Sequence, residues 1–420
     1  MNPFQAPTGT RDVLDPESAR FSLLIERFSK RVRKAGYGLV ISPMFEDLGV
    51  FNRSIGEDSE VVTKEMYEFE DKGGRRLALR PEGTASIVRA FVQHRPQIPW
   101  KAWYATPAFR YERPQAGRYR QHHQVGVEAL GSDDPDLDVE TIALLDGYLR
   151  DVGLRSLDLR INSMGDENCR PGYESVLAGF LEINADALCM EHQGSWRKNP
   201  LRVLDCKRSE CVDLRKKAPR FRDSLCDACT EHFDRVLLGL DALGIVYERD
   251  DFLVRGFDYY TRTTFEVASG VLDSAQNAVG GGGRYDGLTE LLGGPATPGI
   301  GFASGIERVL LAGEAEGLFD EQESRVAVFV VDLTGGEQAR DLTHLMREAG
   351  IASDRAFDDR SMKAQLRQAD RSGATVALIV GADEIERDVI TIKMLRGAKA
   401  HHQEQTPREA LIGRVKELLS

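Results

Sequence analysis

Hydrophobic positions near the start of the chain recur with the period of an amphipathic helix. The apolar residues that share one face are Phe21, Leu24, Ile25, Phe28, Val32 and Ala35. Asp15-Pro16-Glu17 stands before this run and Gly36 after it, so the pattern predicts a long helix capped near Asp15 and ended by Gly36. The next segment, Tyr37 to Pro43, is mostly apolar and is interpreted as a buried strand that Pro43 ends.

Several other apolar or alternating runs predict strands, and few helices separate them. These runs are Arg76 to Leu79, Trp103 to Phe109, Gln124 to Leu130, Asp158 to Ile161 and Thr263 to Ala268. Parallel strands need long crossover connections, whereas antiparallel strands do not. The sequence therefore favours an α+β fold with a mostly antiparallel sheet over a doubly wound sheet.

Two later regions have patterns of their own. Residues 168–240 hold all six cysteines and two apolar helical stretches, Tyr173 to Ile183 and His232 to Leu243, which indicates a helical insertion. From residue 325, strands and helices alternate as expected for a compact α/β domain. The predicted strands there are Val326 to Val331, Ala374 to Val380 and Val389 to Met394, and the predicted helices are Glu337 to Ala349 and Met362 to Ala369. A last helix is predicted to open with a capping box at Thr406-Pro407-Arg408-Glu409.

Composition narrows the class of protein. The chain has 420 residues, 41% of them hydrophobic and 29% charged, as is usual for globular proteins of several domains. No apolar run approaches the roughly 18 residues of a membrane helix, and the opening MNPFQAPTGTRD lacks the features of an export signal. Six cysteines are too few for a disulfide scaffold, so we expect a reducing, cytoplasmic location and no membrane partner.

Charge is unevenly distributed along the chain. The 55 Lys and Arg against 67 Asp and Glu give a net charge of -12, so nonspecific attraction to nucleic acid is not expected. Residues 325–420 hold 15 basic and 15 acidic side chains, so the whole acidic excess lies before them and a composition break falls near residue 320. A polyanionic partner would need local basic patches.

One such patch is a predicted hairpin between Phe109 and Gln124. Residues 110–124 contain four arginines and one glutamate. An arginine on a rigid strand holds phosphate in a bidentate manner, and an arginine in a loop grips a nucleic-acid backbone. A charged hairpin that merely faces solvent is the alternative from these residues alone.

A second candidate is the Gly-rich strand and helix from Gly299 to Leu311. Arg308 falls in the first turns of this helix, where an anion is favoured. The dinucleotide-binding fingerprint fails at Ser304, and the chain has no phosphate-loop motif. Packing of the glycines is the alternative here.

These two segments, together with Gly38 to Pro43, resemble motifs 2, 3 and 1 of the class II aminoacyl-tRNA synthetases. The run LVRGFDYYTRTTFE, Leu253 to Glu266, resembles a signature of the histidyl-tRNA synthetase family. Arg80-Pro81-Glu82-Gly83-Thr84 and Gly281 to Leu288 match further segments of that family. The motifs occur in the family's order, and the resemblance covers essentially the whole chain.

The resemblance implies a division of the chain. Residues 1–167 would form the first part of the catalytic domain with motifs 1 and 2, and 168–240 the helical insertion. Residues 241–322 would complete the catalytic domain with the histidine signature and motif 3, and 325–420 would bind the anticodon. The family acts as a homodimer with motif 1, around Pro43, at the subunit interface.

The resemblance also implies roles in amino-acid activation. Joining a carboxylate to the α-phosphate of ATP requires cationic groups that hold two anions together. Arg110 and Arg255 would bind the α-phosphate, Arg308 the γ-phosphate, and Glu112 would lie near the adenine. Mg²⁺ would bridge the ATP phosphates rather than occupy a protein cage.

Selection of L-histidine requires polar partners for both imidazole nitrogens. By resemblance, Glu128 and Tyr260 would contact the imidazole. The residues that would hold the α-amino group or line the pocket are Glu82, Gly83, Thr84, Gln124, Tyr259 and Tyr285. Without the family, a pair of tyrosines is more often core packing.

Contacts with histidine tRNA are expected at two places. In bacterial members of the family, the loop positions that match Arg113 and Gln115 face the 5′ end of the acceptor stem, and Arg118 and Arg120 are candidates for further phosphate contacts. His122 and His123 alternate on a strand, so at most one faces the site. In the last domain, basic residues at helical spacing are Arg360, Lys363, Arg367 and Arg371.

The cysteines allow a zinc site but do not require one. Cys206, Cys211, Cys226 and Cys229 offer four thiolates, with His232 three residues beyond. Zinc is not general in the family, so free thiols are the favoured interpretation. Cys169 and Cys189 show no partner pattern.

The expected activity is formation of histidyl-adenylate and pyrophosphate from histidine and ATP, then transfer of histidine to the 3′ end of histidine tRNA. One alternative is the synthetase-like regulatory subunit of histidine biosynthesis, which binds histidine without catalysis. Arg110, Arg255, Arg308 and the last domain argue against it. A class II synthetase for another amino acid is the second alternative, and Glu128 and Tyr260 argue against that one.

Overall fold

The computed structural model describes residues 4–56, 59, 61–273, 277–319, 326–358, 360–397 and 400–420. It divides into two compact units, Met1–Phe319 and Asp320–Ser420. The composition break near residue 320, and the predicted boundary at 322–325, fall in a stretch, 320–325, that lies outside the described residues. No described helix is long and apolar enough to cross a membrane.

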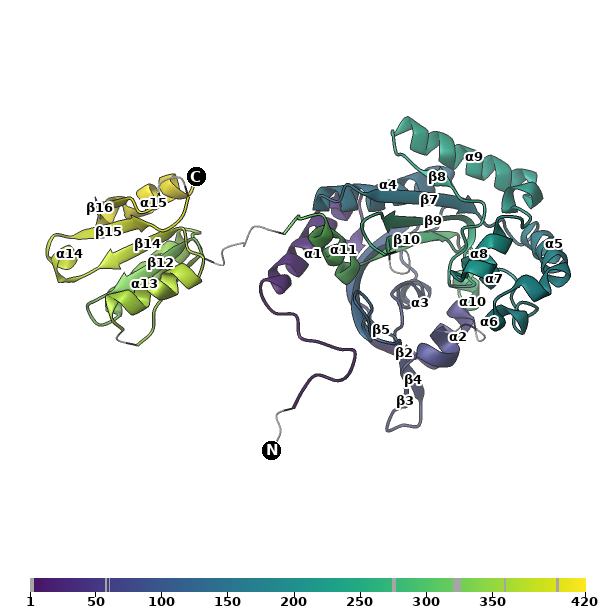
Figure 1. Ribbon diagram of the computed structural model, residues 1–420, viewed down its shortest axis with the longest axis horizontal. Helices are drawn as coiled ribbons and strands as arrows, with labels where there is room; N and C mark the ends of the chain where they lie inside the picture. The colour runs from purple at the N-terminus through teal and green to yellow at the C-terminus, as the bar shows by residue number, and fades with distance from the viewer. Residues whose placement is uncertain are drawn as a thin grey trace. The chain divides into compact units, whose positions relative to one another are not determined.

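An eight-stranded sheet forms the centre of the larger unit (Figure 1). Its strands, in spatial order, are β1 (Gly38–Leu39), β5 (Trp100–Phe109), β6 (Gln121–Leu130), β11 (Gly299–Gly305), β10 (Ala278–Arg284), β9 (Thr261–Ser269), β7 (Leu157–Ser163) and β8 (Glu248–Arg249). Only the two edge pairs, β1 with β5 and β7 with β8, are parallel. The prediction of a mostly antiparallel sheet is confirmed.

One face of this sheet carries the main hydrophobic core. The helices that pack there are α1 (Glu17–Lys34), α4 (Pro135–Val152), α9 (Asp227–Ala242) and α11 (Ile306–Ala315). On β6, Val125, Val127 and Ala129 point into this core. Because side chains alternate along a strand, His122, Gln124 and Glu128 point to the opposite face.

The opposite face is bordered by smaller elements. These are a three-stranded sheet of β2 (Phe45–Asp47), β4 (Arg76–Leu79) and β3 (Glu68–Glu70), and the helices α2 (Leu48–Ile55), α3 (Thr84–His94) and α10 (Leu288–Leu291). The buried Arg80 guanidinium donates to the carbonyls of Ser42, Pro43 and Pro107. It thereby fixes the Ser42-Pro43 segment against β5.

The predicted buried strand from Tyr37 to Pro43 is wrong in length and in burial. Only Gly38–Leu39 is a strand, at the edge of the sheet, and both residues are exposed. Leu39 is 53% exposed and Ile41 is 87% exposed. The run is apolar although the described chain does not cover it, which is typical of an interface.

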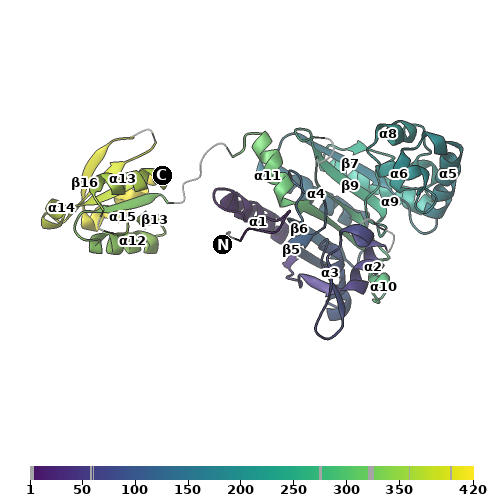
Figure 2. The ribbon, with the colours of Figure 1, turned by 60° about the horizontal axis from the view of Figure 1, so that its bottom comes forward.

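The insertion is helical, as predicted. It contains α5 (Arg170–Ile183), α6 (Met190–Gln193), α7 (Arg202–Asp205), α8 (Ser209–Arg215) and α9. Two views show α5, α6 and α8 gathered at one end of the larger unit, away from α1 (Figures 1 and 2). Several of these helices are only a turn long, so side-chain contacts rather than helix propensity hold them.

The smaller unit is a five-stranded sheet with helices, so the predicted α/β domain is confirmed, although the sequence indicated only three of its strands. The spatial order is β13 (Ser353–Arg355), β12 (Val328–Asp332), β14 (Val376–Val380), β15 (Val389–Met394) and β16 (Gln403–Pro407), with α12 (Glu337–Glu348), α13 (Met362–Arg371), α14 (Ala382–Glu386) and α15 (Leu411–Leu419). The predicted capping box at Thr406 is wrong. Thr406 lies in β16, where it pairs with Ile390 of β15, and α15 starts only at Leu411. Thr406 and Pro407 fit an edge strand equally well.

A buried ion pair joins the sheet to its covering helices. Arg284, on β10, and Asp138, on α4, are both fully buried, and Arg284 Nε lies 2.9 Å from Asp138 Oδ1. His232, on α9, lies 3.2 Å from Asp138 Oδ2. The Arg284 guanidinium also donates to the carbonyls of Ser132 and Asp134, so the arginine's charge is satisfied within the protein.

We predict that Arg284→Ala lowers the stability of the larger unit by about 3–5 kcal/mol, because it removes the arginine partner of the buried Asp138 carboxylate. Urea unfolding followed by tryptophan fluorescence measures this loss. Arg235→Ala is the matched control, since the ion pairs that Arg235 forms with described residues, Asp134 and Asp136, are exposed. A loss no greater than that of the control would contradict the role of Arg284.

Candidate active site

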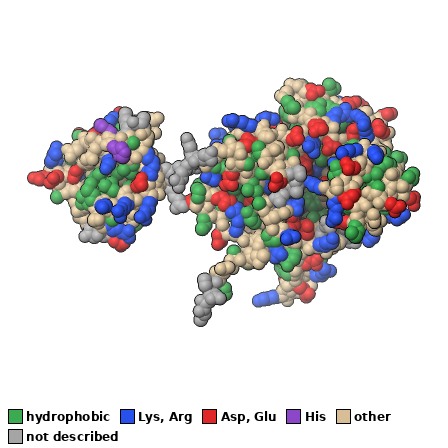
Figure 3. Space-filling view, viewed as in Figure 1, with side chains coloured by type: hydrophobic (Ala, Val, Ile, Leu, Met, Phe, Trp, Pro, Cys, Tyr) green, Lys and Arg blue, Asp and Glu red, His purple; other side chains and the backbone are tan. Residues whose placement is uncertain are grey.

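A cavity of about 230 Å³ opens on the face of the sheet opposite the main core. The predicted site residues that line it are Glu82, Thr84, Arg110, Glu112, Gln124, Arg255, Tyr259, Tyr260 and Arg308. They come from β6, from α11, from the start of α3 and from the segments that follow β5 and precede β9, so the fold unites motifs that are far apart in sequence. The larger unit is visibly hollowed in the space-filling view (Figure 3).

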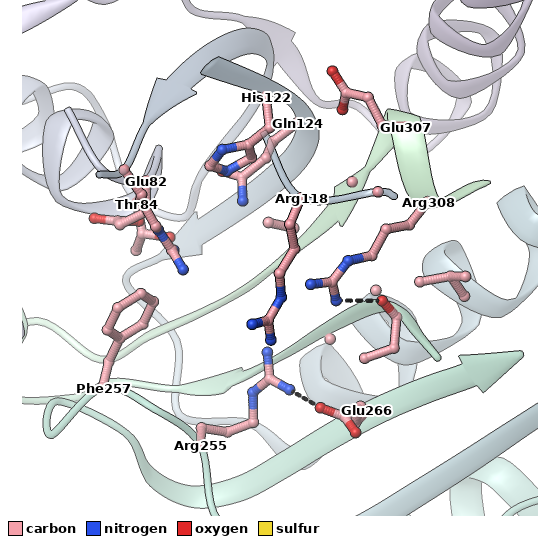
Figure 4. A pocket seen from close by; sticks show the side chains of 18 of the residues that line it. Glu82, Thr84, Arg118, His122, Gln124, Arg255, Phe257, Glu266, Glu307 and Arg308 are labelled. Carbon is pink, nitrogen blue, oxygen red and sulfur yellow. Dashed lines mark hydrogen bonds and ion pairs between the residues drawn. The ribbon is translucent and has the colours of Figure 1, made fainter. Parts of the chain in front are cut away.

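Guanidinium groups dominate the centre of the cavity. Arg118, Arg255 and Arg308 point toward one another from different segments (Figure 4). Arg308 Nη1 donates to the Ala278 carbonyl at 2.9 Å. Burial, together with the charges of Arg118 and Arg110, lowers the pKa of Arg308. The mutual repulsion of these cations is relieved when an anion enters the cavity.

Two carboxylates hold three of the arginines in place. Glu266, on β9, lies 2.5 Å from Arg255 Nη1. Glu112 lies between Arg110 and Arg118, with oxygen–nitrogen distances of 3.8 and 3.6 Å. Arg110 Nε also donates to the Pro81 carbonyl at 2.9 Å. These contacts orient the arginines and still leave guanidinium N–H groups directed into the cavity.

The Gly-rich strand β10 makes room for Arg255. A Cβ atom on Gly281 would lie 2.9 Å from Arg255 Nη1 and 2.9 Å from the Phe265 carbonyl. On the neighbouring strand, a Cβ on Gly301 would lie 1.9 Å from Glu128 Oε2. The two glycines are therefore needed both for packing and for the site, because only glycine leaves room for these two charged side chains on the surface of the sheet.

Glu128 lies at the buried end of the site. Thr84 Oγ1 donates to Glu128 Oε1 at 2.7 Å, and the Tyr285 hydroxyl donates to Oε2 at 2.6 Å. Burial raises the pKa of Glu128 to about 8, although these hydroxyl donors oppose the shift. Tyr259 and Tyr260 are also buried, with ring centres 4.6 Å apart. A carboxyl group among phenols is suited to a ligand that carries N–H groups.

Two further polar side chains, Glu82 and Gln124, line the cavity. Glu82 accepts the backbone N–H groups of Thr84 and Ala85 at the start of α3, at 2.5 and 2.8 Å. Gln124 Oε1 is buried and has no hydrogen-bond partner among the described residues. A buried acceptor without a donor is costly, so this amide oxygen fits a ligand donor such as an amino group.

The predicted loop residues separate into two groups. Arg113 and Gln115 are exposed on the turn between β5 and β6, outside the cavity. The sequence analysis gave Arg118 as a candidate for phosphate contacts with tRNA. In the structure, Arg118 instead lines the cavity. The reason is an isolated bridge between Gln115 and Arg118, which folds the loop so that Arg118 turns inward.

The sequence analysis missed several residues of the cavity. They are His122, Phe257, Glu266 and Glu307. Because side chains alternate along a strand, at most one of His122 and His123 was expected to face the site. In the structure, His122 lines the cavity. His123 Nδ1 lies 2.8 Å from Glu307 Oε1 instead. Glu266 closes the matched signature and could have been found from its place on the strand opposite Gly281.

The four predicted zinc cysteines do not form one site. Cys206 and Cys211 gather with Cys189 and His192, whereas Cys226 and Cys229 gather with Asp166 and Cys169. Cys169 and Cys189, for which the sequence showed no partners, therefore belong to these groups. His232 is engaged with Asp138. The spacing of the cysteines in the sequence could not show that the two pairs lie next to different groups of residues in the folded chain.

An antiparallel sheet with an arginine cluster on one face, an edge segment at Pro43 and a separate α/β unit defines a class II aminoacyl-tRNA synthetase. The family model described as histidyl-tRNA synthetase matches residues 9–165 and 172–309, and the anticodon binding domain model matches residues 325–418. The chain belongs to the histidyl-tRNA synthetase family.

Individual relatives agree with this assignment. The chain is 46% identical to a histidine–tRNA ligase of Rhodococcus erythropolis, over 99% of this chain and 98% of the relative. It is 46% identical to a histidine–tRNA ligase of Halothermothrix orenii, over 93% and 94%. The crystal structure of apo histidyl-tRNA synthetase from S. aureus matches with a TM-score of 0.81 and 35% identity, over 98% of this chain and 100% of that chain.

We predict that the His122 ring stays neutral between about pH 5 and 8. Burial, together with the charges of Arg110 and Arg308, lowers the pKa of His122 to about 3. The unfolded ring takes up a proton that the folded ring cannot, so acidification below about pH 6.5 destabilises the fold through this residue. Nuclear magnetic resonance of labelled histidine, with His122→Gln to assign the signal, measures the titration. A midpoint near pH 6.5 would contradict the prediction.

Proposed function

We propose that this chain is a histidine–tRNA ligase, which activates L-histidine with ATP and transfers the histidyl group to histidine tRNA. The observation that carries the proposal is the meeting of Arg110, Arg118, Arg255 and Arg308 at one cavity, next to the buried Glu128. Such a cavity holds polyphosphate at one end and a ligand with N–H groups at the other. Full-length similarity to proteins named histidine–tRNA ligase supports it.

In the activation step, Arg110 and Arg255 hold the α-phosphate as the histidine carboxylate attacks it. The attack forms the bond to phosphorus, and pyrophosphate leaves. Arg308 binds the γ-phosphate and stabilises the charge of the leaving group. Arg118 lies beside Arg308 in the cavity, so we assign it to the phosphates as well. Glu112 lies near the adenine.

In the histidine pocket, Glu128 and Tyr260 bind the two imidazole nitrogens. Glu82, Thr84 and Gln124 surround the α-amino group, and the free Gln124 Oε1 accepts one of its protons. Gly83 has no side chain because a Cβ there would lie 2.4 Å from the Tyr104 ring. Tyr259 and Tyr285 complete the wall, and Tyr285 keeps Glu128 in position. Ligands that lack the imidazole N–H groups leave these buried groups unpaired and are rejected.

Mg²⁺ would be held mainly by the phosphates of ATP, and it would supply charge neutralisation there. The donors in the cavity fit this role, because Glu112 and Glu266 bring carboxylate oxygens and no cage of acidic residues surrounds them among the described residues. Zinc has no part in this site.

The tRNA contacts involve both units. Arg113 and Gln115 face the acceptor stem, and residues 325–420 bind the anticodon. A shallow groove on α13 is lined by Met362, Lys363, Leu366, Arg367 and Asp370, and apolar side chains bordered by Lys and Arg are visible on the smaller unit (Figure 3). A basic rim around an apolar floor suits phosphates and bases.

The remaining assignments concern the assembly. Residues 1–167 and 241–322 form the catalytic domain, and 168–240 are its insertion. We propose a homodimer that covers the exposed apolar side chains of Leu39, Ile41, Met44 and Phe45, next to Pro43. The protein acts in the cytoplasm, where tRNA charging is needed.

Exchange of labelled pyrophosphate into ATP, without tRNA and with each amino acid in turn, tests the proposed function. Exchange with histidine alone is expected. Histidine binding without exchange would contradict the proposal and favour a regulatory, non-catalytic paralogue. Exchange with a different amino acid would also contradict it and indicate another synthetase of the class.

We predict that Arg255→Ala lowers histidine-dependent exchange by at least about 100-fold, because one preorganised cation for the transferring phosphate is lost. Histidine binding, measured by calorimetry, stays nearly unchanged since Arg255 lies at the phosphate end. Arg113→Ala, an arginine exposed outside the cavity, is the control and keeps normal exchange. Normal exchange in Arg255→Ala would refute the phosphate role.

We also predict that Gln115→Ala slows histidine transfer to tRNA more than it slows exchange. Backbone groups, not the Gln115 side chain, pair with Arg118, so the variant keeps the loop fold and removes only an exposed amide. Single-turnover transfer from preformed adenylate, compared with exchange, measures the difference. Equal losses in both steps would be inconsistent with the acceptor-stem contact.

A further inference from the structure

The insertion contains a cluster of soft metal ligands that the aminoacylation site does not use. Cys189, His192, Cys206 and Cys211 place their ligand atoms within 4.8 Å of one another. From these four residues we propose that the insertion binds one structural Zn²⁺ ion through three thiolates and one imidazole. This set differs from the four cysteines that sequence spacing suggested.

The distances within the cluster match a tetrahedral zinc site. Zinc bonds of about 2.3 Å to sulfur and about 2.0–2.1 Å to nitrogen place two sulfurs about 3.8 Å apart, and sulfur and nitrogen about 3.5 Å apart. Cys189 Sγ lies 3.8 Å from Cys206 Sγ. His192 Nδ1 lies 3.1 Å from Cys189 Sγ and 4.0 Å from Cys211 Sγ. Small side-chain movements would make these edges equal around an ion.

The covalent order of the ligands also fits zinc. Cys189 and His192 are three residues apart across the start of α6, whereas Cys206 directly follows α7 and Cys211 lies in the first turn of α8. Two short loops that each present two ligands are the usual pattern of structural zinc sites. Cys189 and Cys211 are buried, and the Cys189 backbone N–H donates to Cys211 Sγ at 3.5 Å. Such a donor stabilises a metal-bound thiolate.

The second cluster, Asp166, Cys169, Cys226 and Cys229, is less suited to a cation. Asp166 Oδ1 already accepts the Asn168 backbone N–H at 3.0 Å, and Asp166 Oδ2 lies 3.5 Å from the Arg262 guanidinium. A metal ion bound there would face a fixed positive charge. This second cluster therefore provides a matched control within the same insertion.

A zinc ion at the first cluster would stabilise a region with little regular structure. The helices α6 and α7 have four residues each, and α8 has seven. The same region contacts the signature segment that carries Arg255, because Asn199 Nδ2 donates to Asp258 Oδ1 at 3.2 Å. The zinc would thus hold the insertion against the wall of the active site, without touching substrate.

Metal analysis of the full-length protein, purified from zinc-supplemented cells, tests this proposal. We expect Cys206→Ser to lose one equivalent of zinc per chain relative to the unchanged protein, and Cys226→Ser to keep that equivalent. Cys206 is only partly buried, so its substitution by serine disturbs packing little. Zinc content that is equal in Cys206→Ser and the unchanged protein would overturn the proposal, as would a protein without zinc.

Replacement of zinc by cobalt in the protein without substitutions gives a second test, which does not require that a variant fold correctly. After zinc is removed by a chelator under reducing conditions, added Co²⁺ should give the visible absorption of tetrahedral, thiolate-bound cobalt, and Zn²⁺ should displace it. The fluorescence of Trp196, which is 3% exposed in the insertion, should shift on chelation and recover with Zn²⁺. An octahedral cobalt spectrum, or a disulfide between Cys189 and Cys206 in the purified protein, would contradict the site.

Discussion

The structure depends on holding several arginine side chains close to one another with few carboxylates beside them. Arg308 is largely buried, and the nearby charges of Arg118 and Arg110 lower its pKa. Left alone, such a cluster would either spread into solvent or recruit carboxylates. The sheet limits both outcomes, because strands fix the backbone positions and the carboxylates are few: Glu266 pairs with Arg255, and Glu112 is shared by Arg110 and Arg118. An anion bound in the cavity would offset the free-energy cost of this arrangement.

The antiparallel sheet accounts for the division between core and site. Alternation along β6 directs Val125 and Val127 to the helices and directs Gln124 and Glu128 to the cavity. Glycines on the neighbouring strands leave space for the charged side chains on that face. The buried Arg284–Asp138 pair joins β10 to α4, so the floor of the site is held from behind. Stability and chemistry thus occupy opposite faces of one sheet.

Much of this could be predicted from the sequence, since local patterns encode it. The scarcity of helices between predicted strands indicated the antiparallel sheet, and the cysteine-rich helical stretches indicated the insertion. The resemblance to synthetase motifs implied the main cavity residues. Three features could not be predicted, because they depend on tertiary neighbours. The apolar run at Leu39 lies exposed at a sheet edge, Thr406 pairs in a strand rather than capping a helix, and Arg118 turns inward. The cysteines divided into two clusters for the same reason, since spacing does not fix which loops meet.

The most direct test of the account is a crystal structure of the protein with a sulfamoyl analogue of histidyl-adenylate. The account predicts that the imidazole lies between Glu128 and Tyr260, and that the oxygens of the sulfamoyl group, which replaces the α-phosphate, accept hydrogen bonds from Arg110 and Arg255. An analogue bound with its imidazole away from Glu128, or with those oxygens out of reach of both arginines, would contradict the central claim that this arginine cavity is the activation site.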